Sequence, residues 1–130
     1  PQADGALSDD ADFMRKLDET EVQLEAIQHT EFRLMAALSK GDSPGPESSV
    51  IKALSAEITQ RITELTVEAM GQYAAVHQPE ARTVGSNVAT VGPDEGVVAL
   101  SRYFNLRASS IAGGSNEVQR NIMAKLVLGL

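Results

Sequence analysis

Residues 106–130 run Leu106-Arg107-Ala108-Ser109-Ser110-Ile111-Ala112-Gly113-Gly114-Ser115-Asn116-Glu117-Val118-Gln119-Arg120-Asn121-Ile122-Met123-Ala124-Lys125-Leu126-Val127-Leu128-Gly129-Leu130. This pattern predicts a helix, a glycine turn and a second helix. Glycine adopts positive φ and lets a bound group approach the backbone closely. Ser115 and Asn116 favour a helix start. The unpaired N–H groups of a helix start can hold an anion such as a pyrophosphate. Most such turns only connect two helices, so the turn alone does not establish a binding site.

Two long amphipathic helices are predicted upstream of this turn. Ser8 is the expected N-cap of the first helix, which should extend from there to about residue 40. Pro46 should open the second helix, over 46–70, and Gly71 should end it. Apolar residues recur at helical spacing along both, namely Phe13, Leu17, Leu24, Ile27, Leu34, Met35 and Leu38, then Val50, Leu54, Ile58, Ile62, Leu65, Ala69 and Tyr73.

Residues 77–95 predict a long loop, because glycine, proline and small polar residues interrupt the apolar pattern. Third and fourth helices should follow over about 94–109 and 115–128. The apolar side chains expected to be buried in the fourth helix are Val118, Ile122, Met123 and Leu126. The fold class predicted from these patterns is all-α, an antiparallel bundle of about four main helices.

Composition excludes several classes of protein and of site. The 130 residues suffice for one modest domain, and a hydrophobic content of 42% is typical of a globular chain. The net charge of −7 argues against nucleic acid as the main partner. The chain has no cysteine, no apolar run long enough to span a membrane, and only two distant histidines, His29 and His77. We therefore expect no metal site and a cytoplasmic or other soluble intracellular location.

A family resemblance lies in the run Ile111-Ala112-Gly113-Gly114-Ser115-Asn116-Glu117-Val118-Gln119-Arg120-Asn121-Ile122, closed by Leu128-Gly129-Leu130. It resembles the C-terminal signature of the acyl-CoA dehydrogenases, in which G-[TS]-x-E-[IV]-Q-R precedes the final helix. The resemblance implies that residues 1–130 are the C-terminal α-helical domain of such an enzyme. The N-terminal helical domain and the middle β-domain of the family are absent from this chain.

The resemblance also implies a reaction and identifies a missing group. Acyl-CoA dehydrogenases remove the α-proton of an acyl thioester with a carboxylate while the β-hydrogen leaves as hydride to FAD. In many members that base is a Glu immediately before the motif glycine, where this chain has Gly113, so no catalytic residue is assigned. The base lies on a segment upstream of this chain, or comes from a partner subunit, or the activity is lost. Glu117 is not expected to replace it.

The FAD contacts implied by the resemblance fall in two places. After the motif glycine they are Ser115, Asn116 and Glu117, while the backbone of Gly114 approaches the flavin or the thioester. A helix cap at Ser115 is compatible with this role. A second contact, to the FAD of a neighbouring subunit, would use Glu68 and Gly71. Here the sequence departs from the family, which has Gln and a glycine pair, and a carboxylate near a pyrophosphate would be repelled.

Two function classes follow from these expectations. The first is the C-terminal domain of a FAD-dependent acyl-CoA dehydrogenase, which supplies a subunit interface and part of the FAD site. The fragment alone would be inactive. The second is a non-catalytic subunit or binding module of a heteromeric dehydrogenase. The expected partners are an acyl-CoA substrate, electron-transfer flavoprotein or a similar acceptor, and the rest of the enzyme in a dimer or tetramer.

Overall fold

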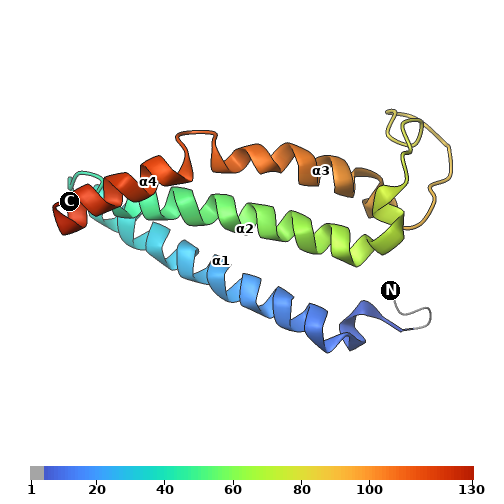
Figure 1. Ribbon diagram of the computed structural model, residues 1–130, viewed down its shortest axis with the longest axis horizontal. Coiled ribbons are helices and arrows are strands. Elements are labelled where there is room, and N and C mark those ends of the chain that lie inside the picture. The colour runs from blue at the N-terminus through green and yellow to red at the C-terminus, as the bar shows by residue number, and fades with distance from the viewer. Residues whose placement is uncertain (1–4) are drawn as a thin grey trace.

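The computed structural model describes residues 5–130, and helices make up most of that range (Figure 1). The four main helices are α1 (Ala11–Leu38), α2 (Glu47–Met70), α3 (Ala99–Leu106) and α4 (Asn116–Met123). Shorter helical segments are η1 (Leu7–Asp9), η2 (Gly71–Ala75), η3 (Asp94–Val98), η4 (Arg107–Ser110) and the π-helix η5 (Ala124–Leu128). No strand occurs among the described residues, so the predicted all-α class is confirmed.

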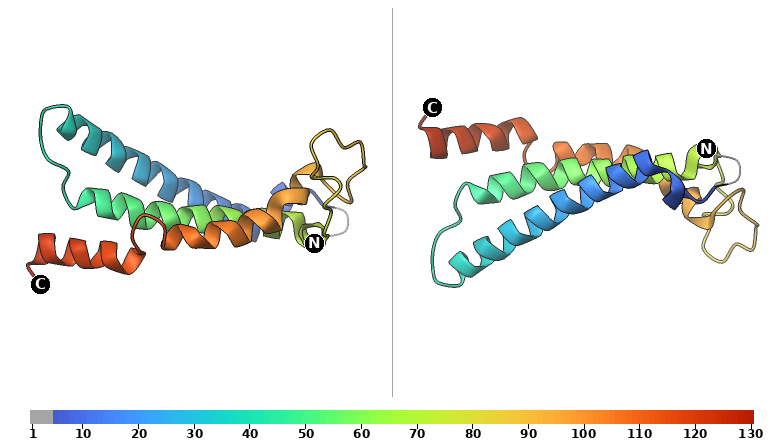
Figure 2. Two further views of the ribbon diagram at one scale, coloured as in Figure 1. Left: turned by 90° about the horizontal axis from the view of Figure 1, so that it is seen from above. Right: turned by 90° about the horizontal axis from the view of Figure 1, so that it is seen from below.

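The long helix α2 is the centre of the arrangement, because it packs against α1, α3 and α4. α1 and α2 form an antiparallel pair joined by the turn at residues 39–46. α3 and α4 follow one another along α2 and run antiparallel to it, with the glycine turn between them (Figures 1 and 2). The turn therefore lies beside the first half of α2, where Lys52, Ala53 and Ala56 bond to the residues on either side of it.

The start of α1 differs from the sequence prediction. Asp10, not Ser8, is the N-cap: its carboxylate accepts from the backbone N–H groups of Asp12 at 3.0 Å and Phe13 at 3.1 Å. Ser8 lies within η1, one turn earlier. Both residue types can cap a helix. At this place the aspartate accepts from two otherwise unpaired N–H groups, and its negative charge interacts favourably with the positive end of the helix dipole.

The face of α2 that meets α3 and α4 is built from small residues. Ser49, Ala56 and Thr63 recur every seven residues and are buried, as is Ala53 beside them. Such a spacing keeps small side chains on one side of the helix, and small side chains permit a short distance between helix axes. Larger apolar side chains, Phe13, Ile27, Ile58 and Leu65, complete the buried core on α1 and α2.

The third helix is shorter than predicted. Residues 94–110 are helical throughout, but only Ala99–Leu106 form an α-helix, and 3-10 helices flank it on both sides. Gly96 is buried in η3, where a Cβ would lie 3.3 Å from the Met70 sulfur, so the backbone packs closely on the end of α2 there. The long connection before it, residues 76–93, contains no regular element, as its composition predicts.

The expected burial of the fourth helix is wrong. Val118, Ile122 and Leu126 are 50%, 37% and 66% exposed, Met123 is half-buried, and Asn116 is the buried side chain of α4. α4 has α2 as its main neighbouring helix, so most of its circumference is uncovered. Periodicity shows which residues share a face, but only the neighbouring helices decide whether that face is covered.

Candidate cofactor site at the glycine turn

The glycine turn connects η4 to α4, which continues along α2 in the same direction (Figure 1). The backbone N–H groups of Ile111 and Ala112 both donate to the carbonyl of Ala108, which closes η4. Gly113 and Gly114 then take φ values of 71° and 94°, in the left-handed region that favours glycine. Two successive positive φ values turn the chain so that Ser115 can begin α4 in an extended conformation.

The two glycines have different surroundings. A Cβ at Gly113 would meet nothing within 4 Å, whereas a Cβ at Gly114 would lie 2.9 Å from the amide nitrogen of Gln119. That amide also donates to the carbonyl of Gly113 at 3.4 Å and so ties the turn back to α4. A side chain at position 114 would therefore displace Gln119 and loosen the turn.

Ser115 is the N-cap of α4, as its residue type predicts. Its Oγ accepts from the backbone N–H of Val118 at 3.4 Å, a long hydrogen bond. This cap satisfies one of the four N–H groups that a helix cannot pair internally. The hydroxyl is half-buried at the edge of the turn, where a ligand approaching the helix N-terminus would meet it.

Glu117 lies in the first turn of α4 and is exposed. Its own backbone N–H and the Ser115 hydroxyl hold the pKa of the Glu117 carboxyl below its ordinary value, helped by the charges of Arg120 and Lys52. The carboxylate is therefore ionised at neutral pH. It stabilises the helix start, and it also opposes a second anion at the same place.

Asn116 points into the bundle. Its side chain is only 5% exposed, and its amide Nδ2 donates to the carbonyl of Ala53 on α2 at 3.3 Å. Its Oδ1 accepts from Nζ of Lys52 at 3.0 Å. Both polar atoms of the buried side chain thus have a partner within the protein, so we expect any contact of Asn116 with a cofactor to be made through its backbone.

Lys52 is a member of this site that the sequence reasoning did not assign. Besides Asn116, its Nζ donates to the carbonyl of Ser109 at 3.3 Å. A weak signal for it exists in the sequence. Lys52 lies three residues after Ser49 and four before Ala56, on the side of α2 that small buried residues occupy. A lysine among such residues requires acceptors across the interface.

The second pair of candidates is far from the turn. Gly71 ends α2 with φ 53° and ψ −132°, a conformation suited to glycine, and Glu68 lies one turn earlier. The rise of an α-helix places Glu68 about 22 Å along α2 from Ala53, beside the turn. The two sets of candidate residues therefore do not form one site within a single chain.

Glu68 is already engaged. Its Oε1 accepts from Nζ of Lys16 at 2.7 Å, and the same ammonium contacts Asp12 at 2.6 Å. This ion pair joins the first turns of α1 to the end of α2. Lys16 offsets part of the negative charge that would repel a pyrophosphate at this position.

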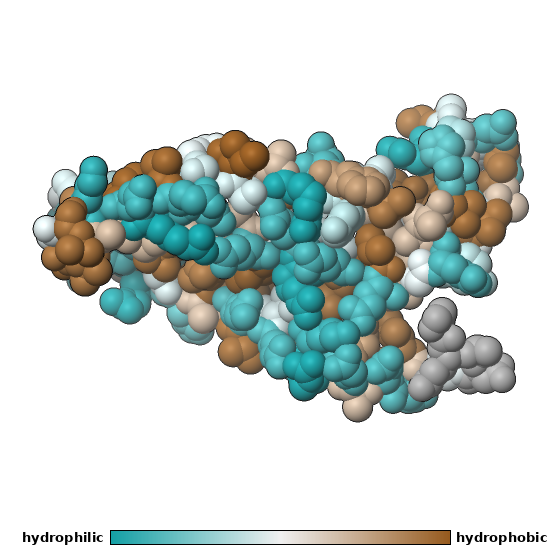
Figure 3. Space-filling view, in the orientation of Figure 1, coloured by the Kyte–Doolittle hydropathy of each residue, from teal (hydrophilic) through white to brown (hydrophobic). Residues whose placement is uncertain are grey.

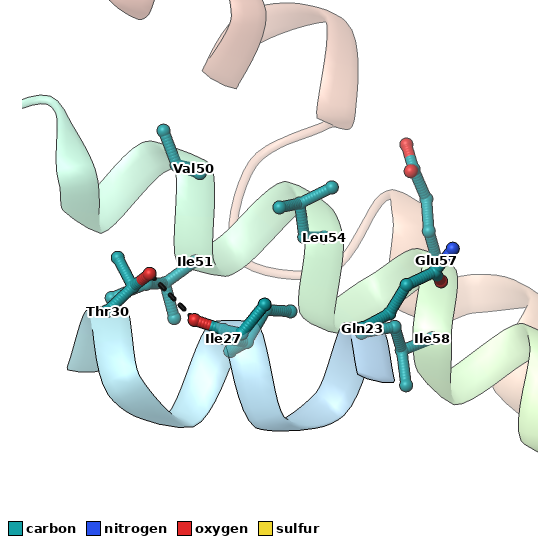
Figure 4. A pocket seen from close by; sticks show the side chains of 9 residues that line it. Gln23, Ile27, Thr30, Val50, Ile51, Leu54, Glu57 and Ile58 are labelled. Carbon is teal, nitrogen blue, oxygen red and sulfur yellow. Dashed lines mark hydrogen bonds between the residues drawn. The ribbon is translucent and has the colours of Figure 1, made fainter. Parts of the chain in front are cut away.

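A separate apolar cavity of about 250 Å³ lies between α1 and α2 (Figure 4). Ile27 on α1 and Ile51 and Leu54 on α2 line it, together with Gln23 and Glu57 (Figure 4). None of the residues of the glycine turn lines it. Among residues 5–130, no group of three or more His, Asp or Glu side chains is placed to hold a metal ion. No helix in that range has the length and apolarity needed to cross a membrane.

Comparison with known families identifies the family of the chain. The family model for the C-terminal domain of acyl-CoA dehydrogenases matches residues 1–128. The chain belongs to this family. No curated protein and no solved structure matched the chain. The chain has Gly113 at the position that the resemblance assigns to the base, and α2 holds both ends of the glycine turn.

Proposed function

We propose that this chain is part of a FAD-dependent acyl-CoA dehydrogenase that removes hydrogen from the α and β carbons of an acyl-CoA thioester. The membership of residues 1–128 in the family carries this proposal. FAD, when bound, accepts the β-hydrogen as hydride. The domain contributes a subunit interface and part of the FAD site. Electron-transfer flavoprotein or a similar acceptor would then receive the electrons.

The glycine turn fits a pyrophosphate by shape and by partial charge. Gly113 and Gly114 carry no side chain that would hold a ligand away from the backbone. The N-terminus of α4 has the positive end of the helix dipole. Glu117 opposes an anion there, while Arg120 and Lys52 offset its charge. In this proposal Ser115 and the adjacent N–H groups bind FAD, and the backbone of Gly114 lies against the flavin or the thioester.

Proton abstraction needs a carboxylate beside the α-carbon, and geometry decides which group can act. Gly113 supplies none, and Glu117 lies in the first turn of α4 with a pKa held below its ordinary value, which does not favour it as a base. In this proposal the base of the active enzyme comes from a residue outside residues 1–130 or from a partner subunit, and the activity is lost if neither supplies it.

The same glycine favours a second candidate function, that of a non-catalytic subunit in a heteromeric dehydrogenase. The two candidates differ in a simple assay. A preparation of the full-length protein alone that oxidises acyl-CoA with an artificial electron acceptor supports the first. Activity that requires addition of a second, different subunit supports the second.

The role of the turn is tested by FAD content in the full-length protein. Ser115→Ala should weaken FAD binding by about 1 kcal/mol, the net contribution of one ordinary hydrogen bond. Gly114→Val should weaken it more, because the side chain displaces Gln119 and a β-branched residue resists positive φ. The matched control is Ser48→Ala, which removes a serine hydroxyl that donates to the carbonyl of Gly45, before α2.

Unchanged FAD content in both the Ser115 and the Gly114 variants would leave the turn as a connection between helices and nothing more. Gly113→Ala separates binding from chemistry. A Cβ has open space there, but a φ of 71° strains an alanine, so this variant should lose some stability and still retain proton abstraction if the base lies elsewhere.

A further inference from the structure

Lys52 connects both sides of the glycine turn to one turn of α2. Its Nζ donates to the carbonyl of Ser109, which precedes the glycine turn, and to Oδ1 of Asn116, which follows it. Only residues 110–115 lie between these two acceptors. One ammonium group therefore fixes the two ends of the segment that contains Gly113 and Gly114.

The same turn of α2 makes further bonds to this segment. The carbonyl of Ala53 accepts from Nδ2 of Asn116 at 3.3 Å, and the carbonyl of Ala56 accepts from Oγ of Ser109 at 3.4 Å. Lys52 is the only charged member of this group. Hydrogen bonds from an ionised donor are the stronger kind, and a half-buried ammonium must keep its acceptors. Lys52 is thus the residue whose loss would release the turn on both sides.

The other ties between α2 and this part of the chain lie farther from the turn. Arg107 pairs with Glu64 at 2.9 Å and donates to the carbonyl of Gln60, so it holds η4 to α2. Arg120 pairs with Glu57 and holds the middle of α4. Neither side chain hydrogen-bonds to Ser109 or Asn116, although the carbonyl of Arg107 accepts from Oγ of Ser110 at 3.1 Å. Each arginine can therefore keep its helix on α2 while residues 111–115 change conformation.

We propose that Lys52 is a positioning residue that sets the conformation of residues 110–115 and so determines how tightly the turn binds the pyrophosphate of FAD. This inference rests on the proposed function. Lys52 does not contact the cofactor in this proposal. It acts through Asn116 and Ser109, and its charge near the N-terminus of α4 opposes that of Glu117.

Lys52→Met in the full-length protein tests the proposal with two measurements. Hydrogen exchange of the backbone amides of residues 112–118 is measured in the cofactor-free protein, and the dissociation constant for FAD is measured by flavin fluorescence. Loss of a charged hydrogen-bond donor should raise both exchange and the dissociation constant about tenfold. Lys52→Arg, which keeps the charge and several donors, should recover most of both effects.

Ile58→Val is the control variant for a general loss of folding stability. Ile58 is 5% exposed and lines the apolar cavity between α1 and α2, which no residue of the glycine turn lines. Its truncation lowers the unfolding temperature without releasing residues 110–115. The Lys52→Met variant should exceed this control in local exchange and in FAD dissociation, even where the two unfold at similar temperatures.

The outcomes separate this proposal from the proposed function. Wild-type protein that binds no FAD would refute the proposed function, and the positioning role would fall with it. Wild-type protein that binds FAD, together with unchanged exchange or unchanged FAD affinity in Lys52→Met, would overturn the positioning role alone. Loss of FAD affinity in Ser115→Ala but not in Lys52→Met would also overturn it, because the turn would then bind FAD without help from Lys52.

Discussion

At the level of single residues, the start of α4 must both stabilise the helix and leave room for an anionic ligand. Ser115 caps the helix, Asn116 turns inward, and Glu117 stays in solvent as a carboxylate. A negative group in the first turn stabilises a helix but competes with an anionic ligand. An exposed carboxylate can be moved aside by its own side-chain rotation, whereas the buried Asn116 cannot. The sequence Ser-Asn-Glu thus combines one fixed residue with two that remain available to a ligand.

The titration of Glu117 is a direct test of this arrangement. Its backbone N–H and the Ser115 hydroxyl lower the pKa of the carboxyl from its ordinary value of 4.5. The folded pKa is therefore below the unfolded one. The contribution of the ionised Glu117 carboxylate to the stability of the folded protein is therefore fully present above the unfolded pKa. It is lost as the pH falls through the folded pKa. Ser115→Ala should move the midpoint upward, as followed by NMR of the Glu117 carboxyl carbon. A midpoint that does not move would show that the hydroxyl makes no contact with Glu117.

At the level of helices, α2 carries most of the interactions that shape the candidate site. Its small residues bring α3 and α4 close, and its backbone carbonyls and polar side chains then hold η4 and the glycine turn. α1 is joined to α2 by apolar packing and by the Lys16 ion pairs at one end. Exposed or half-exposed ion pairs of this kind contribute little individually, so the apolar contacts carry that interface.

The N-cap of α1 gives a prediction for this helix. Asp10→Ala should lower the free energy of unfolding by about 1 kcal/mol, because two backbone N–H groups lose their acceptor. Ser8→Ala is the matched control and should change it little, since Ser8 lies in η1 and does not cap α1. Urea denaturation of both variants provides the measurement. Equal losses, or a larger loss for Ser8→Ala, would contradict the assignment of Asp10 as the cap.

Across the molecule as a whole, the protein leaves much apolar surface uncovered. Leu126, Val127, Leu128 and Leu130 are between 63% and 79% exposed, and hydrophobic side chains gather at the end of the molecule where the C-terminus lies (Figure 3). Phe32 and Met35 on α1 are also more than half exposed. Surface of this kind is typical of contacts with other domains or subunits. It supports the proposed assembly into a dimer or tetramer.

Assembly is tested with Leu126→Gln in the full-length protein. Burial of apolar surface stabilises an interface by about 25 cal/mol per Å². Because the change removes such surface, it should shift the population from the oligomer toward smaller oligomers or monomers. Val84→Gln is the control, because Val84 is fully exposed in the loop of residues 76–93. Light scattering at several concentrations distinguishes the two. A wild-type protein that is monomeric throughout would refute the assembly, and an unchanged Leu126 variant would exclude this surface from it.

The fold class, the helix order and the place of the turn can be predicted from the sequence. Apolar spacing predicts α1 and α2, Pro46 and Gly71 mark the two ends of α2, and the glycine pair marks the start of α4. These features are local, because φ preferences and helix periodicity act within a few residues. Local preference places the cap of α1 two residues too early, since Ser8 and Asp10 have similar tendencies to cap a helix.

Tertiary packing determines which side chains carry the site. Asn116 is an ordinary helix-start residue in the sequence, but it is buried because Ala53 and Lys52 on α2 face it across the interface. Val118 and Leu126 have the spacing of core residues, yet they stay exposed because no described helix covers them. The hydrogen bonds of Lys52 join residues 57 and 64 positions apart in the chain. Local preferences carry no information about such distant partners, so the burial and bonding of these residues follow only from how the helices pack.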